Sequence, residues 1–528
     1  MIRVIVIILL LVSSLDALMA QHLLPLNKHR SMAAEHQMYK NGEQQFTALK
    51  PLVISDTGEL FKGVYTREGE GKNWFWRKLR YENLIMVETE DFRFTADPVL
   101  HFEMSKNQDI DEYLFRNTRG FQVAGRIGKK VAFHSVLYEN QVAFQPFVNE
   151  FISEKKVIPF AANYKPYEAP FSQLYPNGYD FAVAEGVISW NAFPFLNIQF
   201  GQGKNFVGDG YRSLLLSDNS YSYPYLKAIA TFGKIQYSMM YAELMDFDLP
   251  NTTESGFRKK RFNMLFLNWQ ATKWLQVGLF EATIYNPEDS TGYSNFKPNY
   301  INPLILSRTA EYGLSGKNNV ILGLNWKVLL PAKIQLYGQV VLDDLAHNAP
   351  ENAADEASKF GFQLGGKWFD ALTISDLYLQ GEINSVEPYT YGHAKVSQNY
   401  GHARQSLAHP MGANFTEMVG ILSYQYRDFE IELQANYANY QTDTALNMSG
   451  KDLFVSQNLS PLNTNKQTID TKFAYVHAQF SYLLNPRTDM RIYAGVALRK
   501  ETSDIVDNQD VFVFFGLRTF LSNRLFDF

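Results

Sequence analysis

The chain has 528 residues, no cysteine and a formal net charge of −5, which excludes disulfide scaffolds and thiolate metal sites and gives no indication of nucleic acid as a partner. Aromatic residues make up 15% of the sequence, yet mean hydropathy is −0.24. A long chain that is aromatic-rich and still slightly polar is unusual for a cytosolic enzyme. It is typical of a transmembrane β-barrel, whose strands alternate apolar and polar side chains.

Residues 1–20 have the pattern of an export signal. Arg3 precedes an unbroken apolar run at 4–12, and small residues lead to a predicted cleavage after Ala20. The run is too short to cross a bilayer as a helix, and no later apolar run approaches the roughly eighteen residues that a membrane helix needs. Because Gln21 rather than a cysteine follows, no lipid anchor is predicted there.

Residues 21–90 do not show strand periodicity and are predicted to be an N-terminal periplasmic segment. Within it, KNWFWRKLRYENLIMVE places Phe75, Leu79 and Met86 at helical spacing. The sequence is compatible with two locations for this helix. It packs at the periplasmic mouth of the barrel, or it lies on the inner leaflet of the outer membrane.

From residue 92 the sequence alternates apolar and polar residues in segments of strand length. In NVILGLNWKV, Leu322 and Leu324 face one side while Asn325 and Lys327 face the other. The pattern predicts eighteen strands, near 92–103, 119–128, 131–139, 180–190, 195–203, 225–232, 235–245, 261–269, 275–285, 319–327, 334–343, 359–368, 376–385, 415–426, 429–440, 471–483, 490–500 and 511–519.

The connections between these strands alternate between short and long. Tight turns are predicted near 128–130, 191–194, 233–234, 270–274, 330–333, 369–375, 427–428 and 485–489, and the longest connections cover 140–179, 286–318, 386–414 and 441–470. Outer-membrane barrels have short periplasmic turns and long outer loops. We therefore predict an all-β fold, with residues 91–528 forming a closed antiparallel barrel in the outer membrane.

The long connection at 201–225, GQGKNFVGDGYRSLLLSDNSYSYPY, contains motifs that resemble catalytic ones. Phe206 stands where the dinucleotide fingerprint needs its third glycine, and Asp209 stands where a phosphate loop needs lysine. The Ser-Asp-Asn triplet at 217–219 occurs in penicillin-binding enzymes, but their Lys-Thr-Gly motif is absent from the sequence. The segment therefore indicates a folded outer loop, without a cofactor or catalytic residues.

The connection at 386–414 concentrates His393, His402 and His409 around Ser406. One interpretation is a metal site or a serine–histidine hydrolase at the membrane surface. The other is a structured loop whose polar side chains bind one another in the barrel mouth. We favour the second, because no acidic residue stands beside His402 or His409, and predict neither a metal nor an enzyme.

Two blocks carry a family resemblance. FVGDGYRSLLLSDNSYSYPYLK and NYGHARQSLAHPMGANF, with a weaker match at WFWRKLRYENLIMVETEDFRFTADPVL, resemble the Wzi capsule-assembly type of outer-membrane barrel, in particular the Bacteroidetes branch of the gliding-motility protein RemB. This resemblance implies an eighteen-stranded barrel partly closed by folded outer loops. It also implies a non-enzymatic role with surface polysaccharide and in gliding motility. Outer-membrane lipid and proteins of motility or secretion machinery are the other implied partners.

The residues of these blocks are the candidate site. They either contact polysaccharide or bind the two loops together as a plug, and they are Asp209, Tyr211, Arg212, Asp218, Asn219, His402, Arg404, His409 and Asn414. The alternative function is a porin-like channel for sugars or other small solutes, since glutamine-rich strands suit a water-filled lumen.

Overall fold

The computed structural model describes residues 22–41, 46–54, 72–175, 177–250, 257–286, 302–307, 318–344, 359–443, 448–455, 468–519 and 526–527. The export signal predicted at 1–20 lies outside these residues.

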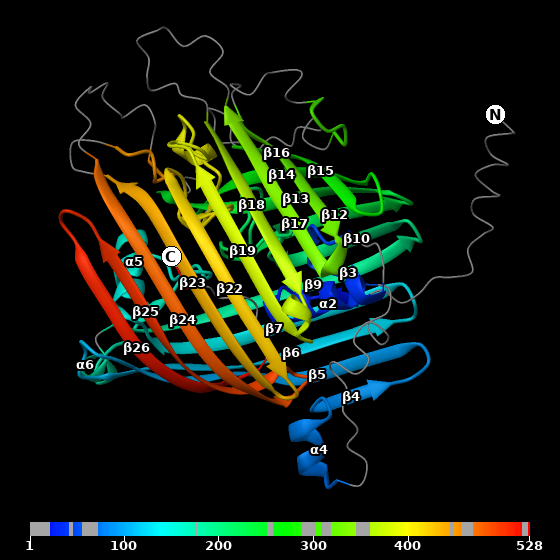
Figure 1. Ribbon diagram of the computed structural model, residues 1–528, viewed down its shortest axis with the longest axis horizontal. Helices are drawn as coiled ribbons and strands as arrows, with labels where there is room; N and C mark the ends of the chain where they lie inside the picture. Colours follow the sequence, from blue (N-terminus) through cyan, green and yellow to red (C-terminus); the bar gives the residue numbers. More distant parts are fainter. Residues whose placement is uncertain are drawn as a thin grey trace, which may run out of the picture.

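Eighteen antiparallel strands form a closed barrel (Figure 1). They are β5 (Phe92–Asn107), β6 (Tyr113–Ile127), β7 (Val131–Ala143), β9 (Gly178–Phe193), β10 (Leu196–Gly203), β12 (Tyr223–Phe232), β13 (Ile235–Pro250), β14 (Phe257–Gln270), β15 (Leu275–Tyr285), β16 (Asn319–Leu330), β17 (Ile334–Asp344), β18 (Lys359–Phe369), β19 (Leu377–Val386), β22 (Phe415–Tyr426), β23 (Phe429–Thr442), β24 (Ile469–Asn485), β25 (Met490–Thr502) and β26 (Asp507–Arg518). Each corresponds to a predicted strand, so the predicted barrel is confirmed.

The barrel closes between its first and last long strands. β26 pairs with the second half of β5, from Phe512 opposite Asn107 to Arg518 opposite His101. The first half of β5 pairs instead with the short β4 (Ile85–Glu88). The two-residue β8 (Lys165–Pro166) lies beside β9 in the same way.

The strand alternation separates a polar lumen from an apolar outer wall. In β16, Asn325 and Lys327 are buried inside, whereas Leu324 is exposed on the outside. The outer wall also exposes Phe200 and Leu364. An apolar outer surface of this kind suits the hydrocarbon layer of a membrane. Closure of the sheet also leaves no strand edge whose backbone groups lack hydrogen bonds in that layer.

One end of the barrel, here called the turn end, carries the tight turns, and the other, the loop end, carries the long connections. Gly128 and Gly233 adopt positive φ (56° each) in two turns, a conformation that favours glycine. Phe193, Phe195 and Phe232 stack beside the turns, with ring centroids 5.5 and 4.7 Å apart. Such aromatic residues mark a membrane interface.

The N-terminal segment enters the lumen at the turn end. It comprises β1 (His22–Leu24), α2 (Lys28–Asn41), β2 (Leu49–Lys50) and β3 (Leu52–Ile54). His36 of α2 lies 3.1 Å from Asp370, in the turn between β18 and β19, and Tyr39 donates a hydrogen bond to the carbonyl of Leu330. Part of the segment predicted as periplasmic is therefore packed inside the barrel wall.

The remaining elements are short. α4 (Trp74–Arg80) lies at the turn end, and α5 (Pro146–Lys155) and α6 (Phe171–Leu174) belong to the connection between β7 and β9. The other loop elements are β11 (Phe206–Val207), β20 (Gly401–His402), β21 (Gln405–Ser406) and the 3-10 turns η2 (Pro331–Lys333), η3 (Ala371–Thr373) and η4 (Val396–Gln398). Among the described residues, no helix combines the length and the apolar character that crossing a membrane requires.

Candidate functional site

Two long connections and the N-terminal segment meet inside the barrel. Residues 204–222 and 387–414, together with 22–41 and 46–54, are called the plug below. β11 of the first connection pairs with β2 of the N-terminal segment, with Phe206 opposite Lys50 and Val207 opposite Leu49. Lys50 Nζ also donates to the carbonyl of Gly208 at 2.9 Å. These contacts join the first connection to the N-terminal segment.

Tyrosine hydroxyls bind the two connections to each other. Tyr391 and Tyr400 donate to the carbonyls of Leu214 and Leu215, each at 2.7 Å. All four side chains are fully buried, as is that of Leu216. Leu214, Leu215 and Leu216 therefore form the hydrophobic centre of the plug.

The barrel wall leaves space for this leucine cluster at Gly323 of β16. A Cβ atom at this position would lie 2.2 Å from Leu215 Cδ2, well inside van der Waals contact. Because interiors are closely packed, even one added methyl group there displaces the plug.

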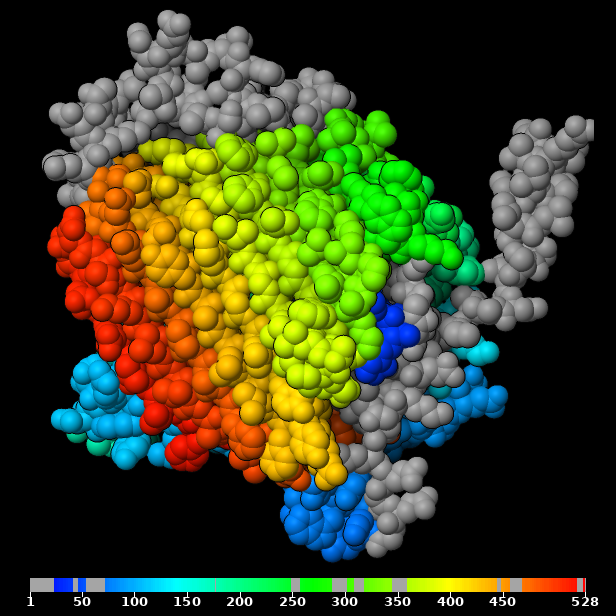
Figure 2. Space-filling model, in the orientation of Figure 1, coloured from blue at the N-terminus to red at the C-terminus, as the bar shows by residue number. Residues whose placement is uncertain are grey.

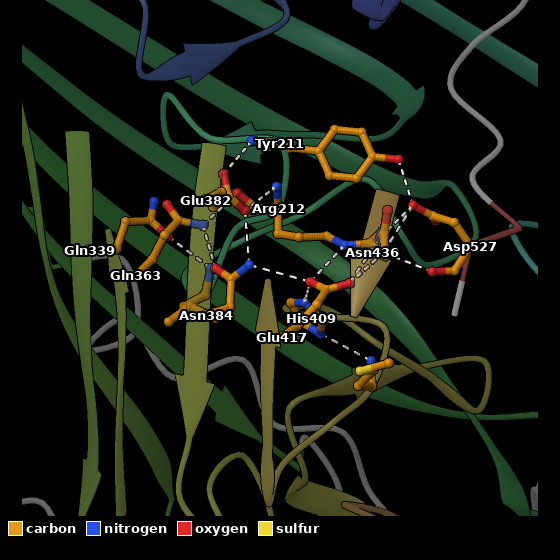
Figure 3. Close-up of polar contacts among 12 residues, drawn as sticks. Tyr211, Arg212, Gln339, Gln363, Glu382, Asn384, His409, Glu417, Asn436 and Asp527 are labelled. Carbon is orange, nitrogen blue, oxygen red and sulfur yellow. Dashed lines mark hydrogen bonds and ion pairs between the residues drawn. The ribbon is translucent and has the colours of Figure 1, made fainter. Parts of the chain in front are cut away.

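Arg212 is the centre of a buried ion network (Figure 3). Its Nη2 lies 3.0 Å from Glu417 Oε1 on β22 and 3.1 Å from Asp527 Oδ2, and these side chains are at most 4% exposed. His409 Nε2 lies 2.7 Å from the other oxygen of Glu417. One carboxylate of the wall thus binds both crowded connections, and Asp527 binds the same guanidinium nitrogen.

Glu382 of β19 fixes the backbone in front of this arginine. Its oxygens accept hydrogen bonds from the backbone N–H of Tyr211 at 2.7 Å and of Arg212 at 3.1 Å. Tyr337 and Asn384 donate to the same carboxylate at 2.8 and 2.9 Å. The carboxylate is therefore satisfied by donors from both the plug and the wall (Figure 3).

A second ionic cluster joins the first connection and the N-terminal segment of the plug to the barrel wall. Asp209 lies 3.6 Å from Lys327, while Glu35 lies 2.6 Å from Lys367 and 3.4 Å from Lys50. Burial opposes ionisation of Asp209, but the nearby lysines outweigh it and lower the pKa of this carboxyl to about 2. The pKa of Glu35 is lowered in the same way, chiefly by Lys367 and Lys50 against the effect of burial. Both carboxylates are charged at neutral pH.

His402 is held as a neutral side chain. Burial, reinforced by Lys260, lowers its pKa to about 3. Its Nδ1 accepts a hydrogen bond from the backbone N–H of Met245 at 2.9 Å, and its ring stacks on Tyr221 with centroids 6.0 Å apart. Burial also lowers the pKa of His409, although Glu417 acts in the opposite direction.

The other predicted residues lie nearer the surface of the plug. Asn219 Nδ2 donates to the carbonyl of Ser406 at 3.2 Å, and Asn414 Nδ2 donates to that of Ser449 at 2.6 Å. Arg404 reaches the carbonyls of Lys155 and Phe247 at 3.3 and 3.4 Å. Asp218 is half-buried. The nine candidates are thus distributed through one plug rather than gathered around a single pocket.

Several functional partners were not predicted from the sequence. Glu417, Asp527 and Lys327 complete the ion pairs of Arg212 and Asp209. The sequence did contain an indication that Glu417 has a partner. Glu417 lies on the same lumen-facing side of its strand as Phe415 and Val419, and a charged residue at such a position indicates a partner inside the barrel.

The side chains suited to catalysis or metal binding have other partners. Ser406 Oγ accepts from the backbone N–H of Ala408 at 3.1 Å, while the neighbouring histidines bind Met245 and Glu417. His29, Glu430 and Glu432 come together at the turn end with ligand atoms within 4.8 Å of one another. Lys28 lies 3.0 Å from Glu432, so this group is better described as an ion-pair network than as a metal site.

A polar cavity of about 190 Å³ remains between the plug and the wall. Tyr211, Gln434, Tyr475, His477 and Asp527 are among its lining residues. A cavity with these donors and acceptors suits water or one small hydrogen-bonding solute.

No family model and no curated protein matches the chain. Among solved structures it is similar to Wzi of Escherichia coli, described as an outer membrane protein involved in group 1 capsule assembly and as a carbohydrate-binding β-barrel. The TM-score is 0.54 at 13% identity, over 96% of this chain and 100% of that one. It is also similar to OprD of Pseudomonas aeruginosa, with a TM-score of 0.41 at 10% identity, over 81% of this chain and 96% of the other. OccAB2 of Acinetobacter baumannii gives 0.41 at 7% identity, over 81% and 98%. The chain therefore has the fold of outer-membrane β-barrels, shared over nearly its whole length with Wzi.

Proposed function

We propose that this protein is a non-enzymatic outer-membrane barrel that binds or organises surface polysaccharide at its loop end. The observation that carries the proposal is the buried Arg212–Glu417–Asp527 network, which fills the lumen with charges that have partners inside the protein. A barrel whose lumen is closed in this way is better suited to holding surface loops in place than to conducting solutes. The capsule-assembly role and carbohydrate binding described for Wzi support the same proposal.

The nine candidate residues act in this proposal as plug residues. Asp209, Arg212, His402 and His409 are fully or nearly fully buried, and each binds a partner within the protein. They hold the loops in place, while polysaccharide contacts the outer surface of the loops.

Exposed aromatic side chains at the loop end supply that outer surface. Tyr113 begins β6 and Phe171 lies in α6, and both side chains are largely exposed. Aromatic rings pack against the apolar faces of sugars, while neighbouring amides and hydroxyls bind sugar hydroxyl groups.

Calorimetric titration of the purified barrel with polysaccharide from the same cells tests the binding. We expect saturable heat for the native chain and a weaker affinity for Tyr113→Ala/Phe171→Ala. Phe200→Ala is the matched control, because Phe200 and Phe171 are equally exposed, at 65%, but Phe200 belongs to the wall. Equal affinities for all three proteins would contradict a loop-end binding surface.

Planar bilayers separate this proposal from the porin-like alternative. The closed plug predicts no resolved conductance steps for the native chain, because the described lumen contains packed side chains. Reproducible steps that block on adding sugar would support the channel instead.

A role in gliding motility is the finer part of the proposal and rests on the sequence resemblance to the RemB-like branch. Deletion of the gene is expected to reduce colony spreading and the amount of polysaccharide retained on cells. Loss of retained polysaccharide with normal spreading would leave polysaccharide binding in place and remove the motility role.

A further inference from the structure

The turn end carries an apolar surface that the barrel itself does not cover. Residues 72–88, here called the rim segment, contain α4, which projects from this end of the barrel, and β4, which lies beside the start of β5 (Figures 1 and 2). In α4, Trp74, Phe75 and Trp76 are 62%, 57% and 49% exposed. In β4, Ile85 and Val87 are 50% and 47% exposed.

The rim segment is attached to the barrel through polar contacts, so its position is defined. Asn485 Nδ2, at the end of β24, donates to the carbonyls of Lys78 and Glu82, each at 3.0 Å. Asn83 Nδ2 and the backbone N–H of Leu84 donate to Asp97 at 2.6 and 2.8 Å. The polar side of the segment faces the barrel, and the aromatic side faces away.

Strand register shows that the apolar side of β4 continues the outer wall. Even-numbered residues of β5 face outward, since Phe102 and Met104 are exposed while His101 is buried. Val87 lies directly opposite Phe94, and Ile85 lies opposite Ala96. Residues opposite each other in an antiparallel pair point to the same face. Val87 and Ile85 therefore extend the outward-facing apolar surface beside the first residues of β5.

The charge of the segment is also informative. Residues 72–88 contain the basic residues Lys72, Arg77, Lys78 and Arg80 and the acidic residues Glu82 and Glu88, so the segment keeps an excess of positive charge. Within it, Glu82 lies 2.9 Å from Lys78 and 3.3 Å from Arg77. Tryptophan with lysine and arginine is the composition of segments that lie in the headgroup layer of a bilayer, where aromatic rings enter the acyl boundary and basic groups meet anionic lipids.

We propose that the rim segment is an interfacial anchor that inserts Trp74, Phe75 and Trp76 into the inner leaflet of the outer membrane beside anionic phospholipid headgroups. The continuity of β4 with the outer wall places it at the lipid boundary, and the basic residues select an anionic surface. The anchor fixes the height and orientation of the barrel in the membrane independently of any polysaccharide binding.

A spin label attached to a single cysteine tests this placement, since the native chain contains no cysteine. Phe75→Cys is labelled in the full-length protein, which is reconstituted into phosphatidylethanolamine vesicles with or without phosphatidylglycerol. Lys129→Cys is the matched control, because Lys129 is exposed in a tight turn at the same end. Migration of the unheated protein in a gel confirms that each variant is folded, and Trp74→Cys replaces Phe75→Cys if the latter does not fold.

The label at 75 is expected to collide more often with oxygen than with a water-soluble nickel chelate, and the label at 129 to show the reverse. Phosphatidylglycerol should increase the protection at 75. Lys72→Gln/Arg77→Gln should remove this increase, since each basic residue near an anionic surface contributes about fivefold to partition. A label at 75 that is as accessible to nickel as the label at 129 in both vesicles would overturn the proposal and assign the surface to a protein partner. Protection that is equal in both vesicles would overturn the anionic-lipid part.

Discussion

Arg212 compensates two carboxylates inside the barrel, so its replacement tests the plug directly. Arg212→Met keeps much of the side-chain volume but leaves Glu417 and Asp527 buried without this cation. Removing one partner of a buried ion pair typically costs about 3–5 kcal/mol. In this variant Glu417 still has His409 as a hydrogen-bond partner at 2.7 Å, so we expect a cost in the lower part of this range. The population of undocked plug is therefore expected to rise by roughly two to three and a half orders of magnitude.

Hydrogen exchange measured by mass spectrometry gives this population for each segment of the chain. Exchange of residues 204–222 and 387–414 should accelerate by the same factor, while the strands of the wall remain protected. Arg404→Met is the matched control, because Arg404 lies nearer the surface of the plug and donates to the backbone carbonyls of Lys155 and Phe247 at 3.3 and 3.4 Å. Its expected effect is about 1 kcal/mol, or roughly fivefold.

The double variant Arg212→Met/Glu417→Gln tests whether uncompensated charge is the cause. Because the glutamine carries no charge, the double variant is expected to be closer to the native chain than Arg212→Met alone. The reasoning fails if Arg212→Met exchanges within threefold of the native chain, about 0.7 kcal/mol. The reasoning also fails if the destabilisation of the double variant equals the sum of the destabilisations of Arg212→Met and Glu417→Gln alone.

Three further substitutions address packing, hydrogen bonding and charge in the plug. Gly323→Ala introduces a methyl group against Leu215 and should destabilise plug docking by about 1–3 kcal/mol, whereas Gly381→Ala, with nothing within 4 Å of its Cβ, should leave exchange in the plug unchanged. Tyr400→Phe leaves the buried carbonyl of Leu215 without its hydroxyl donor and should cost about 1–3 kcal/mol in the same assay. His402, with a pKa of about 3 in the folded chain and an ordinary value of 6.5, contributes stability above pH 6.5 that is lost as pH falls. The loss should reach about 2–3 kcal/mol by pH 4.5 and be absent in His402→Gln, and identical pH profiles of the two proteins would contradict a buried neutral histidine.

The barrel strands could be predicted from the sequence because each strand carries its own signal. Alternation in NVILGLNWKV assigns Asn325 and Lys327 to the lumen without knowledge of any neighbour. The two plug connections were identified from crowded polar residues and from a family resemblance. Periodicity could not predict which residues of the plug and the wall form ion pairs with each other.

Ion pairs across the lumen join residues that are far apart in the sequence. Arg212 and Asp527 are 315 positions apart, and Lys367 and Glu35 are 332 apart. No local pattern encodes such a pair, because it depends on how the closed barrel places its strands around the plug. For the same reason, α2 could be recognised neither as a lumen element nor as the partner of Lys367.

Asp527 follows β26, the strand that completes the wall by pairing with β5. Its carboxylate reaches Arg212, which stands between β10 and β12 in the first half of the chain. The ion network therefore depends on a residue that the chain supplies only after its last barrel strand. If the strands join the wall in chain order, Arg212 would be the part of the plug that gains its second carboxylate last.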